Sequence, residues 1–245
     1  MNKVYYLLIL LVIVIVVVKY RYTVIYTTSI ISSRFVCKNT NLKEYRKCGK
    51  IFIHNDDISG PANSSRLGLY WEPWMKHVIQ KYSNPNKSAM DIGSHIGTHT
   101  ITLSEYFKNV YAFEPNPNIF NNLELNTNKL RNVTLFNKAV GDIQKNKKLI
   151  VKDINTHSYI EHYYETIEIE QIKIDDLKIR DTIGFIKIDI EGYEIPAFVG
   201  MYNLIKRDNP VIVYEDHDGK NTAYLRKNHN YKIIKINSTN FIAVK

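Results

Sequence analysis

The sequence has only two cysteines, Cys37 and Cys48, among its 245 residues, and no Cys-x-x-Cys pair. Zinc ribbons and zinc fingers need closely spaced thiolates or thiolate–histidine sets, so a structural zinc site of this kind is excluded. Both cysteines precede the motifs described below. They can form one disulfide if this part of the chain faces an oxidising compartment, or they can remain free thiols.

The complete glycine fingerprint of dinucleotide-binding proteins is also missing. This fingerprint, G-x-G-x-x-G, needs its middle glycine because the backbone there approaches a pyrophosphate. Gly93 stands at the first position, but His95 occupies the middle one and Thr98 the third. A bulky imidazole at the middle position argues against NAD and FAD as ligands.

No uncharged apolar run reaches the ~20 residues that usually span a bilayer. The nearest, Val4–Val18, would extend about 22 Å as a helix. Together with the residues up to position 28, it predicts an uncleaved N-terminal membrane anchor. A cleaved signal peptide and a buried core helix are the alternatives, although no small-residue cleavage site follows the run. Basic residues are more numerous after the run than before it, which favours a cytosolic C-terminal domain.

The most informative stretch begins at residue 88, where the pattern is typical of a strand, a tight loop and a helix. A short apolar run ends at Asp91-Ile92, and Gly93 and Gly97 follow in the loop. The next predicted strand, Val110–Phe113, ends at Glu114, from which a carboxylate can accept hydrogen bonds from a ribose diol. S-adenosylmethionine (SAM) has a ribose and an adenine but no phosphate, so this unit fits SAM. We expect the following residues to bind it: Asp91, Gly93, His95, Gly97, Thr98 and Glu114.

A second informative segment is the predicted strand Ile183–Glu191. With the two-residue period of a strand, its isoleucines face one side from Ile186 onward, whereas Lys187, Asp189 and Glu191 face the other. A central parallel strand is usually apolar on both faces, and charges there are costly unless they are paired or used. An internal Lys187–Asp189 ion pair is one explanation. We favour a catalytic role, because ligands of open α/β sheets bind beyond the carboxyl ends of the strands.

His217 follows the next predicted strand, Pro210–Tyr214, at the same edge of the sheet. The ordinary pKa of a histidine lies close to neutral and suits a base that takes a proton from a hydroxyl; a surface histidine is the alternative. Asp189 and Asp216 could instead hold a divalent cation, since Mg²⁺ needs few carboxylates. The candidate catalytic residues are therefore Lys187, Asp189, Glu191 and His217, and a metal ion stays optional.

Four ordered segments resemble the FkbM-type SAM-dependent methyltransferase family: Asp91–Thr100, Phe113–Pro117, Ala139–Asp142 and Ile186–Glu194. The resemblance extends from roughly Phe52 to the C-terminus, and it departs from the family at Ser94-His95, where Ala-Asn is usual. It implies an α/β, Rossmann-like class I methyltransferase fold, whose mostly parallel seven-stranded sheet ends in a C-terminal antiparallel hairpin. It also implies that Val140 presses on the adenine and that Asp142 accepts a hydrogen bond from its amino group. An Asx turn with Gly141 is the alternative for Asp142.

We therefore predict a single-pass anchor at 1–28, a juxtamembrane stalk at 29–50 and an FkbM-like methyltransferase domain at 51–245. The predicted function is SAM-dependent O-methylation of a hydroxyl on a sugar, glycolipid or small metabolite. The net charge of +9 keeps an RNA ribose methyltransferase open, and a membrane-anchored, non-catalytic binding module is the third possibility. The anchor and the family motifs make nucleic acid the less favoured partner. Histidines and tyrosines between residues 157 and 164 are candidates for contact with a sugar.

Overall fold

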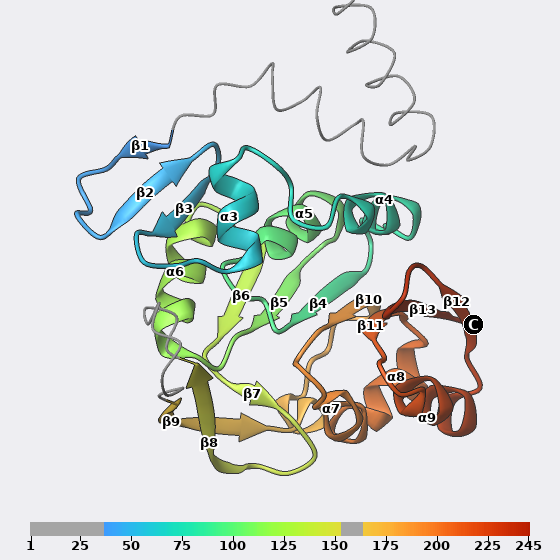
Figure 1. Ribbon diagram of the computed structural model, residues 1–245. Coiled ribbons are helices and arrows are strands. Elements are labelled where there is room, and N and C mark those ends of the chain that lie inside the picture. The colour runs from blue at the N-terminus through green and yellow to red at the C-terminus, as the bar shows by residue number, and fades with distance from the viewer. Residues whose placement is uncertain (1–36, 153–163) are drawn as a thin grey trace, which may run out of the picture.

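The computed structural model describes residues 37–152 and 164–245, and its centre is a seven-stranded sheet (Figure 1). The strand order is β12-β13-β11-β10-β4-β5-β6. Neighbouring strands are parallel except at β13, which is antiparallel to both β11 and β12. The strands are β4 (Ser88–Ile92), β5 (Val110–Phe113), β6 (Val133–Phe136), β10 (Ile183–Ile188), β11 (Val211–Glu215), β12 (Lys232–Lys235) and β13 (Asn240–Val244). This is the expected Rossmann-like sheet with its C-terminal hairpin.

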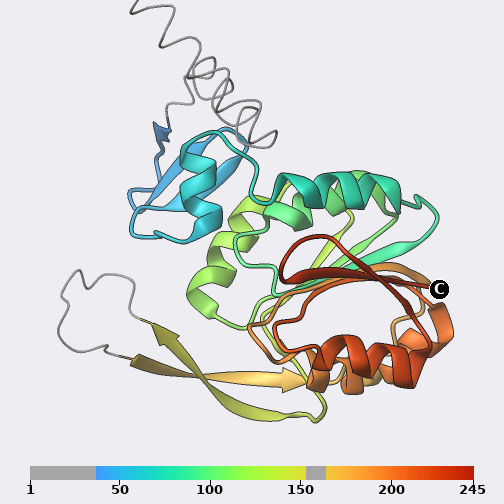
Figure 2. The same cartoon turned by 45° about the vertical axis from the view of Figure 1, so that its right-hand side comes forward.

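Helices cover both faces of this sheet (Figure 2). One face carries α4 (Pro73–Lys81), α5 (Thr98–Tyr106) and α6 (Pro117–Thr127). The other carries α7 (Glu194–Gly200), α8 (Tyr202–Asp208) and α9 (Lys220–His229). The order of the strands reverses between β4 and β10, which lie side by side although about 90 residues separate them. The carboxyl ends of these two strands are therefore where an open α/β sheet places its ligand.

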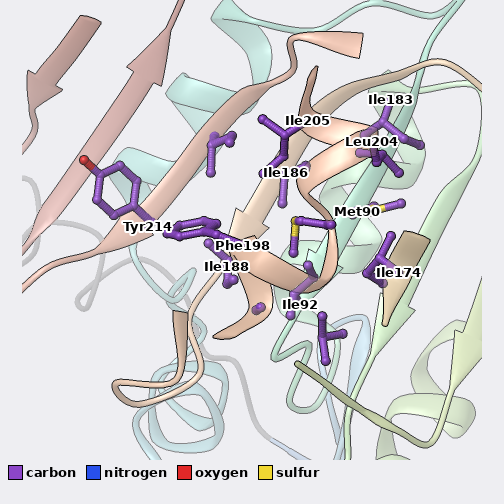
Figure 3. Packing of buried hydrophobic residues seen from close by; sticks show 14 of the residues in the cluster. Met90, Ile92, Ile174, Ile183, Ile186, Ile188, Phe198, Leu204, Ile205 and Tyr214 are labelled. Carbon is purple, nitrogen blue, oxygen red and sulfur yellow. The ribbon is translucent and has the colours of Figure 1, made fainter. Parts of the chain in front are cut away.

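The side chains of β4 and β10 alternate between the two faces. Met90, Ile186 and Ile188 pack with α7, α8 and α9 in one buried apolar cluster (Figure 3). Phe185 belongs instead to the cluster that includes residues of α4 and α5. Lys187 follows Phe185 by two positions and therefore points to the same face as Phe185. The predicted alternation is confirmed for Ile186, Lys187 and Ile188, but the strand ends at Ile188, so Asp189 and Glu191 lie in the turn that follows it and not on the strand.

The first described residues form a small sheet, where the sequence predicted a stalk. β1 (Lys38–Asn39), β2 (Tyr45–Cys48) and β3 (Ile51–His54) pair antiparallel in that order. A disulfide joins Cys37 to Cys48. Of the two options left open for the cysteines, the structure has the paired one. Residues 37–50 thus belong to the folded part of the chain, which differs from the predicted boundary at residue 51.

Two asparagines of α6 attach this small sheet to the rest of the domain. Asn126 Oδ1 accepts from the Phe52 N–H (2.6 Å), and Asn122 Oδ1 accepts from the His54 N–H (3.1 Å). Both side-chain amides donate to the Phe52 carbonyl. Asn126 also donates to the carbonyl of Ile96 (2.8 Å). The two amides therefore bond the backbone of β3 as a neighbouring strand would. Asn126 also connects β3 to the loop that follows β4.

A two-stranded ribbon extends from the carboxyl edge of the main sheet (Figure 2). Its strands β8 (Lys145–Lys152) and β9 (Tyr164–Ile172) are antiparallel, and the short β7 (Ala139–Val140) runs parallel to β9. The remaining elements are α3 (Gly60–Arg66) and a short 3-10 helix, η1 (Ile174–Leu177).

Within residues 37–152 and 164–245, no helix combines the length and apolar character that crossing a membrane requires. The predicted anchor at 1–28 lies outside the described residues, as does the first part of the predicted stalk. The same holds for the proposed sugar contacts His157, Tyr159, His162 and Tyr163.

Candidate active site

The loop after β4 adopts backbone angles that bring it against the end of β10. Gly93 has φ +79°, and a Cβ at this position would lie only 2.0 Å from the carbonyl oxygen of Asp189. Gly97 has φ +90°, and a Cβ there would lie 2.8 Å from Leu123. The N–H groups of Gly93 and Ser94 both donate to the Phe113 carbonyl (3.0 Å). The two glycines are therefore required for close approach on both sides of the loop.

Glu114 lies at the end of β5 and is buried beneath this loop. Its Oε2 accepts from the His95 N–H (3.0 Å), and its Oε1 accepts from the Asn116 N–H (2.9 Å). Burial raises the pKa of Glu114 to about 7, although both hydrogen bonds and the charge of Lys187 oppose this rise. Each carboxylate oxygen keeps a second lone pair, so Glu114 can also accept hydrogen bonds from the hydroxyls of a ligand.

The loop retains polar atoms that a polar ligand can satisfy. Thr98 Oγ1 and His95 Nδ1 are buried and have no hydrogen-bond partner in the described structure. Buried polar groups normally have partners, so such atoms mark a place where a ligand or water belongs. Together with Glu114 and the close approach at Gly93, this set fits a nucleoside such as that of SAM. The structure thus brings the predicted loop residues together, while their binding of SAM stays a prediction.

Lys187 is the centre of a buried ion network. Its Nζ donates to the Gly93 carbonyl (2.8 Å) and lies 3.6 Å from both Asp91 Oδ1 and Asp189 Oδ2. Burial alone would lower the pKa of Lys187, but the charges of Asp189 and Asp91 outweigh burial and raise it. The ammonium is therefore permanently charged and holds the loop, β4 and β10 in place. The Lys187–Asp189 ion pair, one of the two explanations of the charges on the predicted strand, is therefore present, and Asp91 is an additional partner.

Asp91 is completely buried on the other side of this network. Its Oδ2 accepts from the Thr100 hydroxyl (2.6 Å), which ties β4 to the first turn of α5. Its Oδ1 has no hydrogen bond and faces Lys187. The Asp91 side chain thus positions the loop, and its predicted contact with a ligand stays a prediction.

A rim of carboxylates lies beyond the buried network. Asp189 is 35% exposed, and Glu191, with φ +55°, is exposed in the turn after β10. Glu215 ends the neighbouring strand β11. Burial and the charges of Asp189 and Glu191 raise the pKa of Glu215, whereas His217 opposes this effect. Asp189 and Glu191 therefore remain candidates for contact with an acceptor.

His217 and Asp216 occupy different positions from those expected of a base and a metal ligand. The His217 side chain is 67% exposed and lies 3.5 Å from Glu215. Asp216 is buried, and its two oxygens accept from the N–H groups of Gly219 and Thr222 at the start of α9. No group of three or more His, Cys, Asp or Glu suited to a metal ion occurs among residues 37–152 and 164–245. The Asp216 carboxylate serves the helix start, and metal binding stays an untested hypothesis.

The predicted adenine turn packs against α7. Gly200 of α7 approaches the Gly141 carbonyl so closely that a Cβ would lie 1.8 Å from it. Val140 is buried in the same apolar cluster as Phe198. Asp142 lies 3.5 Å from Gln171 Nε2 and remains partly exposed. The turn is rigidly held, while the contacts of Val140 and Asp142 with adenine stay predictions.

One polar cluster near the site carries no clear signal in the sequence. His99 Nε2 lies 3.2 Å from Glu72, and His99 Nδ1 lies 3.2 Å from the Tyr70 hydroxyl, which also bonds Thr102 (2.6 Å). Glu72 has φ +49°, although it is not a glycine. The contact joins residues 27 positions apart, so neither periodicity nor a local motif could have found it.

Comparison with known families agrees with this geometry. A family model described as the methyltransferase FkbM domain matches residues 91–233, which is more than half of the chain. The chain belongs to the FkbM methyltransferase family. The matched FkbM region includes the loop after β4, Glu114, the ion network and the carboxylate rim.

Among curated proteins, the FkbM chain is similar to the hexuronic acid methyltransferase AglP of Haloferax volcanii. The two are 33% identical over 137 residues, which cover 53% of this chain and 55% of AglP. The chain thus spans about half the length of this relative.

Among solved structures, it is similar to the FkbM methyltransferase of Methylobacillus flagellatus, with 18% identity and a TM-score of 0.48 over 75% of this chain and 52% of that one. Aeropyrum pernix fibrillarin, solved with bound SAM, has 10% identity and a TM-score of 0.47, covering 69% and 70% of the two chains.

Proposed function

We propose that the protein is a SAM-dependent methyltransferase that methylates a hydroxyl group of a sugar. The observation that carries this proposal is Glu114, a buried carboxylate held between two loop N–H groups, next to the tightly folded loop after β4. Membership of the FkbM family supports the reaction. The name of the relative AglP, a hexuronic acid methyltransferase, supports a sugar as the acceptor.

Some residues of the site hold the cofactor, and others face the sugar acceptor. Glu114 and the loop hold the nucleoside, and the Lys187 network fixes the loop. When bound, SAM supplies a methyl group from its sulfonium, and the electron pair of the broken S–C bond stays on sulfur. Asp189, Glu191 and Glu215 at the rim can accept hydrogen bonds from sugar hydroxyls and so orient one of them. The polar groups of a sugar acceptor match this arrangement.

The same rim disfavours RNA as the acceptor. Carboxylates repel a phosphate backbone, and proteins that bind nucleic acid use basic residues along the contact. The test is methyl transfer from labelled SAM to a panel of methyl hexosides, methyl hexuronates and short RNAs. Label in a sugar and none in RNA supports the proposal, whereas labelled RNA alone overturns it.

Binding of SAM is expected to depend on pH through Glu114. Its pKa of about 7 lies above the ordinary value of 4.5 for a glutamate, so the free protein carries a proton on Glu114 below pH 7. A ligand that needs the carboxylate must displace this proton, so the Kd for SAM falls about tenfold between pH 6 and pH 8. Calorimetric titration measures this. In Glu114→Gln the pH dependence disappears and binding is weaker by about 30–100-fold, as for a lost charge-assisted hydrogen bond. Equal affinities of the two proteins would contradict the site.

The raised pKa of Glu114 also makes the stability of the protein depend on pH. Between pH 4.5 and pH 7 the folded chain binds a proton on Glu114 that the unfolded chain has lost. Stability from this group is therefore greatest at low pH and falls as pH rises through this window, by about 3 kcal/mol in all.

We further propose that residues 1–28 anchor the protein in a membrane, since Val4–Val18 is an unbroken apolar run. The basic residues after the run favour a cytosolic domain, whereas the Cys37–Cys48 disulfide is typical of an oxidising compartment. We expect the disulfide to be the better indicator, and therefore propose that the domain faces an oxidising compartment. In cells, a maleimide should then label both cysteines only after reduction. Alkaline extraction should leave the full chain in the membrane and release a chain that starts at residue 29. Labelling without reduction would contradict the oxidising location.

A further inference from the structure

The histidines around the site differ in what their ring nitrogens contact. His99 uses both nitrogens, for Glu72 and for Tyr70. His217 is mostly exposed and lies beside Glu215. His95 has a buried Nδ1 without a partner, and its Nε2 makes no hydrogen bond to any residue of the described ranges. Of these histidines, His95 is the one whose ring remains available for a ligand.

The backbone of His95 is held in an unusual conformation. Its φ of +50° is left-handed, which costs a non-glycine residue about 1–2 kcal/mol. The His95 N–H bond to Glu114 and the bond from Asn126 to the neighbouring Ile96 carbonyl maintain this conformation. Such strain persists where the surrounding structure over-determines it, and it is concentrated at functional sites. The position of the His95 ring is thus fixed by Glu114, which also belongs to the proposed nucleoside site, and by Asn126 of α6.

Burial keeps the ring of His95 neutral, and the charges around it act in both directions. Burial lowers the pKa of His95, and the ammonium of Lys187 on β10 adds to this effect. Asp57, between β3 and α3, and Asp189, at the end of β10, act in the opposite direction. Glu114 faces the backbone of the same residue from β5. At pH 7 the imidazole is therefore uncharged, and two carboxylates are near enough to stabilise the imidazolium once it forms.

We propose that His95 is the proton acceptor for the sugar hydroxyl, a role that rests on the proposed methyl transfer. The O–H bond breaks and its proton moves to Nε2 of His95. The electron pair of that bond forms the new bond from oxygen to the methyl carbon, while the sulfur keeps the pair of the broken S–C bond. Asp57 and Asp189 then stabilise the charged ring. This role replaces the one predicted for His217.

A titration of the histidine rings tests the position of His95 without any acceptor. Side-chain NMR of the full protein should show the ring of His95 with a pKa below the ordinary value. Burial also lowers the pKa of His229, so the His95 signal is identified as the one that is missing in His95→Asn. Asparagine tolerates a left-handed φ, so the variant keeps the fold. SAM carries a positive sulfonium and S-adenosylhomocysteine does not. The His95 titration should therefore lie about one pH unit lower with SAM than with S-adenosylhomocysteine. Identical titrations with both ligands would overturn the proposal.

Kinetics test the chemical role. With a sugar acceptor, His95→Asn should lower kcat by about 100-fold and remove the acid limb of the pH–rate profile, as expected for a lost general base. Because Nδ1 of His95 also lines the proposed nucleoside site, the Kd for SAM is measured alongside, and kcat is taken at saturating SAM. His77→Asn, on the exposed face of α4, is the matched control and should leave both values unchanged. Loss of the acid limb in His217→Asn instead would refute the role of His95. A wild-type protein that binds no SAM would refute the proposed function itself.

Discussion

Replacement of Lys187 by methionine is expected to lower the free energy of unfolding by about 3–5 kcal/mol. The Lys187 side chain is 6% exposed and lies 3.6 Å from both Asp91 and Asp189. Methionine fills a similar volume but leaves the fully buried Asp91 without its counter-charge. The Gly93 carbonyl also loses its donor. For a chain of this size, the loss corresponds to a melting temperature lower by about 6–20 °C.

A double variant separates the charge from the packing. Asp91→Asn keeps an acceptor for the Thr100 hydroxyl and removes the buried charge. If the cost of Lys187→Met comes from an unpaired carboxylate, the combination of both changes is less destabilised than Lys187→Met alone, by about 1–3 kcal/mol. Urea unfolding of the wild type, the two single variants and the double variant gives this coupling. Simple addition of the two single effects would mean that the network is not an energetic unit.

The second large effect is expected for Gly93→Ala. The new methyl group would lie 2.0 Å from the Asp189 carbonyl oxygen, and neither backbone can move freely, because the Asp189 N–H bonds Ile92 and the Gly93 N–H bonds Phe113. Steric strain and the left-handed φ together cost about 3–5 kcal/mol. Displacement of the loop also moves the His95 N–H away from Glu114, so SAM binding should fall by about 100-fold or more.

Gly192→Ala is the matched control for this prediction. Gly192 has φ +90°, similar to Gly93, but a Cβ there meets no atom within 4 Å. It should cost only the left-handed strain of about 1–2 kcal/mol. Thermal unfolding and SAM titration of both variants measure the difference. Equal losses in the two variants would show that backbone strain, and not the approach to Asp189, explains the role of Gly93.

The backbone features that the sequence predicted correctly depend on short-range patterns. The loop with Gly93 and Gly97 could be predicted because an acid, two glycines and a helical segment follow one another directly. The sides of β10 could be predicted because alternate residues of a strand face opposite ways. The C-terminal hairpin, which the resemblance to the FkbM family implied, consists of β12 and β13, two segments close in sequence. Each of these features depends on residues that are close in sequence.

The partners of charged side chains could not be predicted in the same way. Lys187 was expected at the reaction centre, but Asp91, 96 positions earlier, is one of its partners. Asp216 was a metal candidate, but its oxygens bond the start of α9. Residues 37–50 were predicted to be a stalk because their polar side chains show no period, yet a disulfide and the pairing of β2 with β3 hold them in a sheet.

The sequence alone determined the class of fold, which its resemblance to the FkbM family implied. It also determined the position of the loop after β4 and of Glu114, because local periodicity and glycine placement specify the backbone there directly. The tertiary structure decided which charges are neutralised and which remain available. That choice depends on distances between strands that are adjacent only in the folded sheet, where burial makes an unpaired charge costly. For this reason Lys187 belongs to the scaffold of the site, whereas the ring of His95 is the one that we propose for proton transfer.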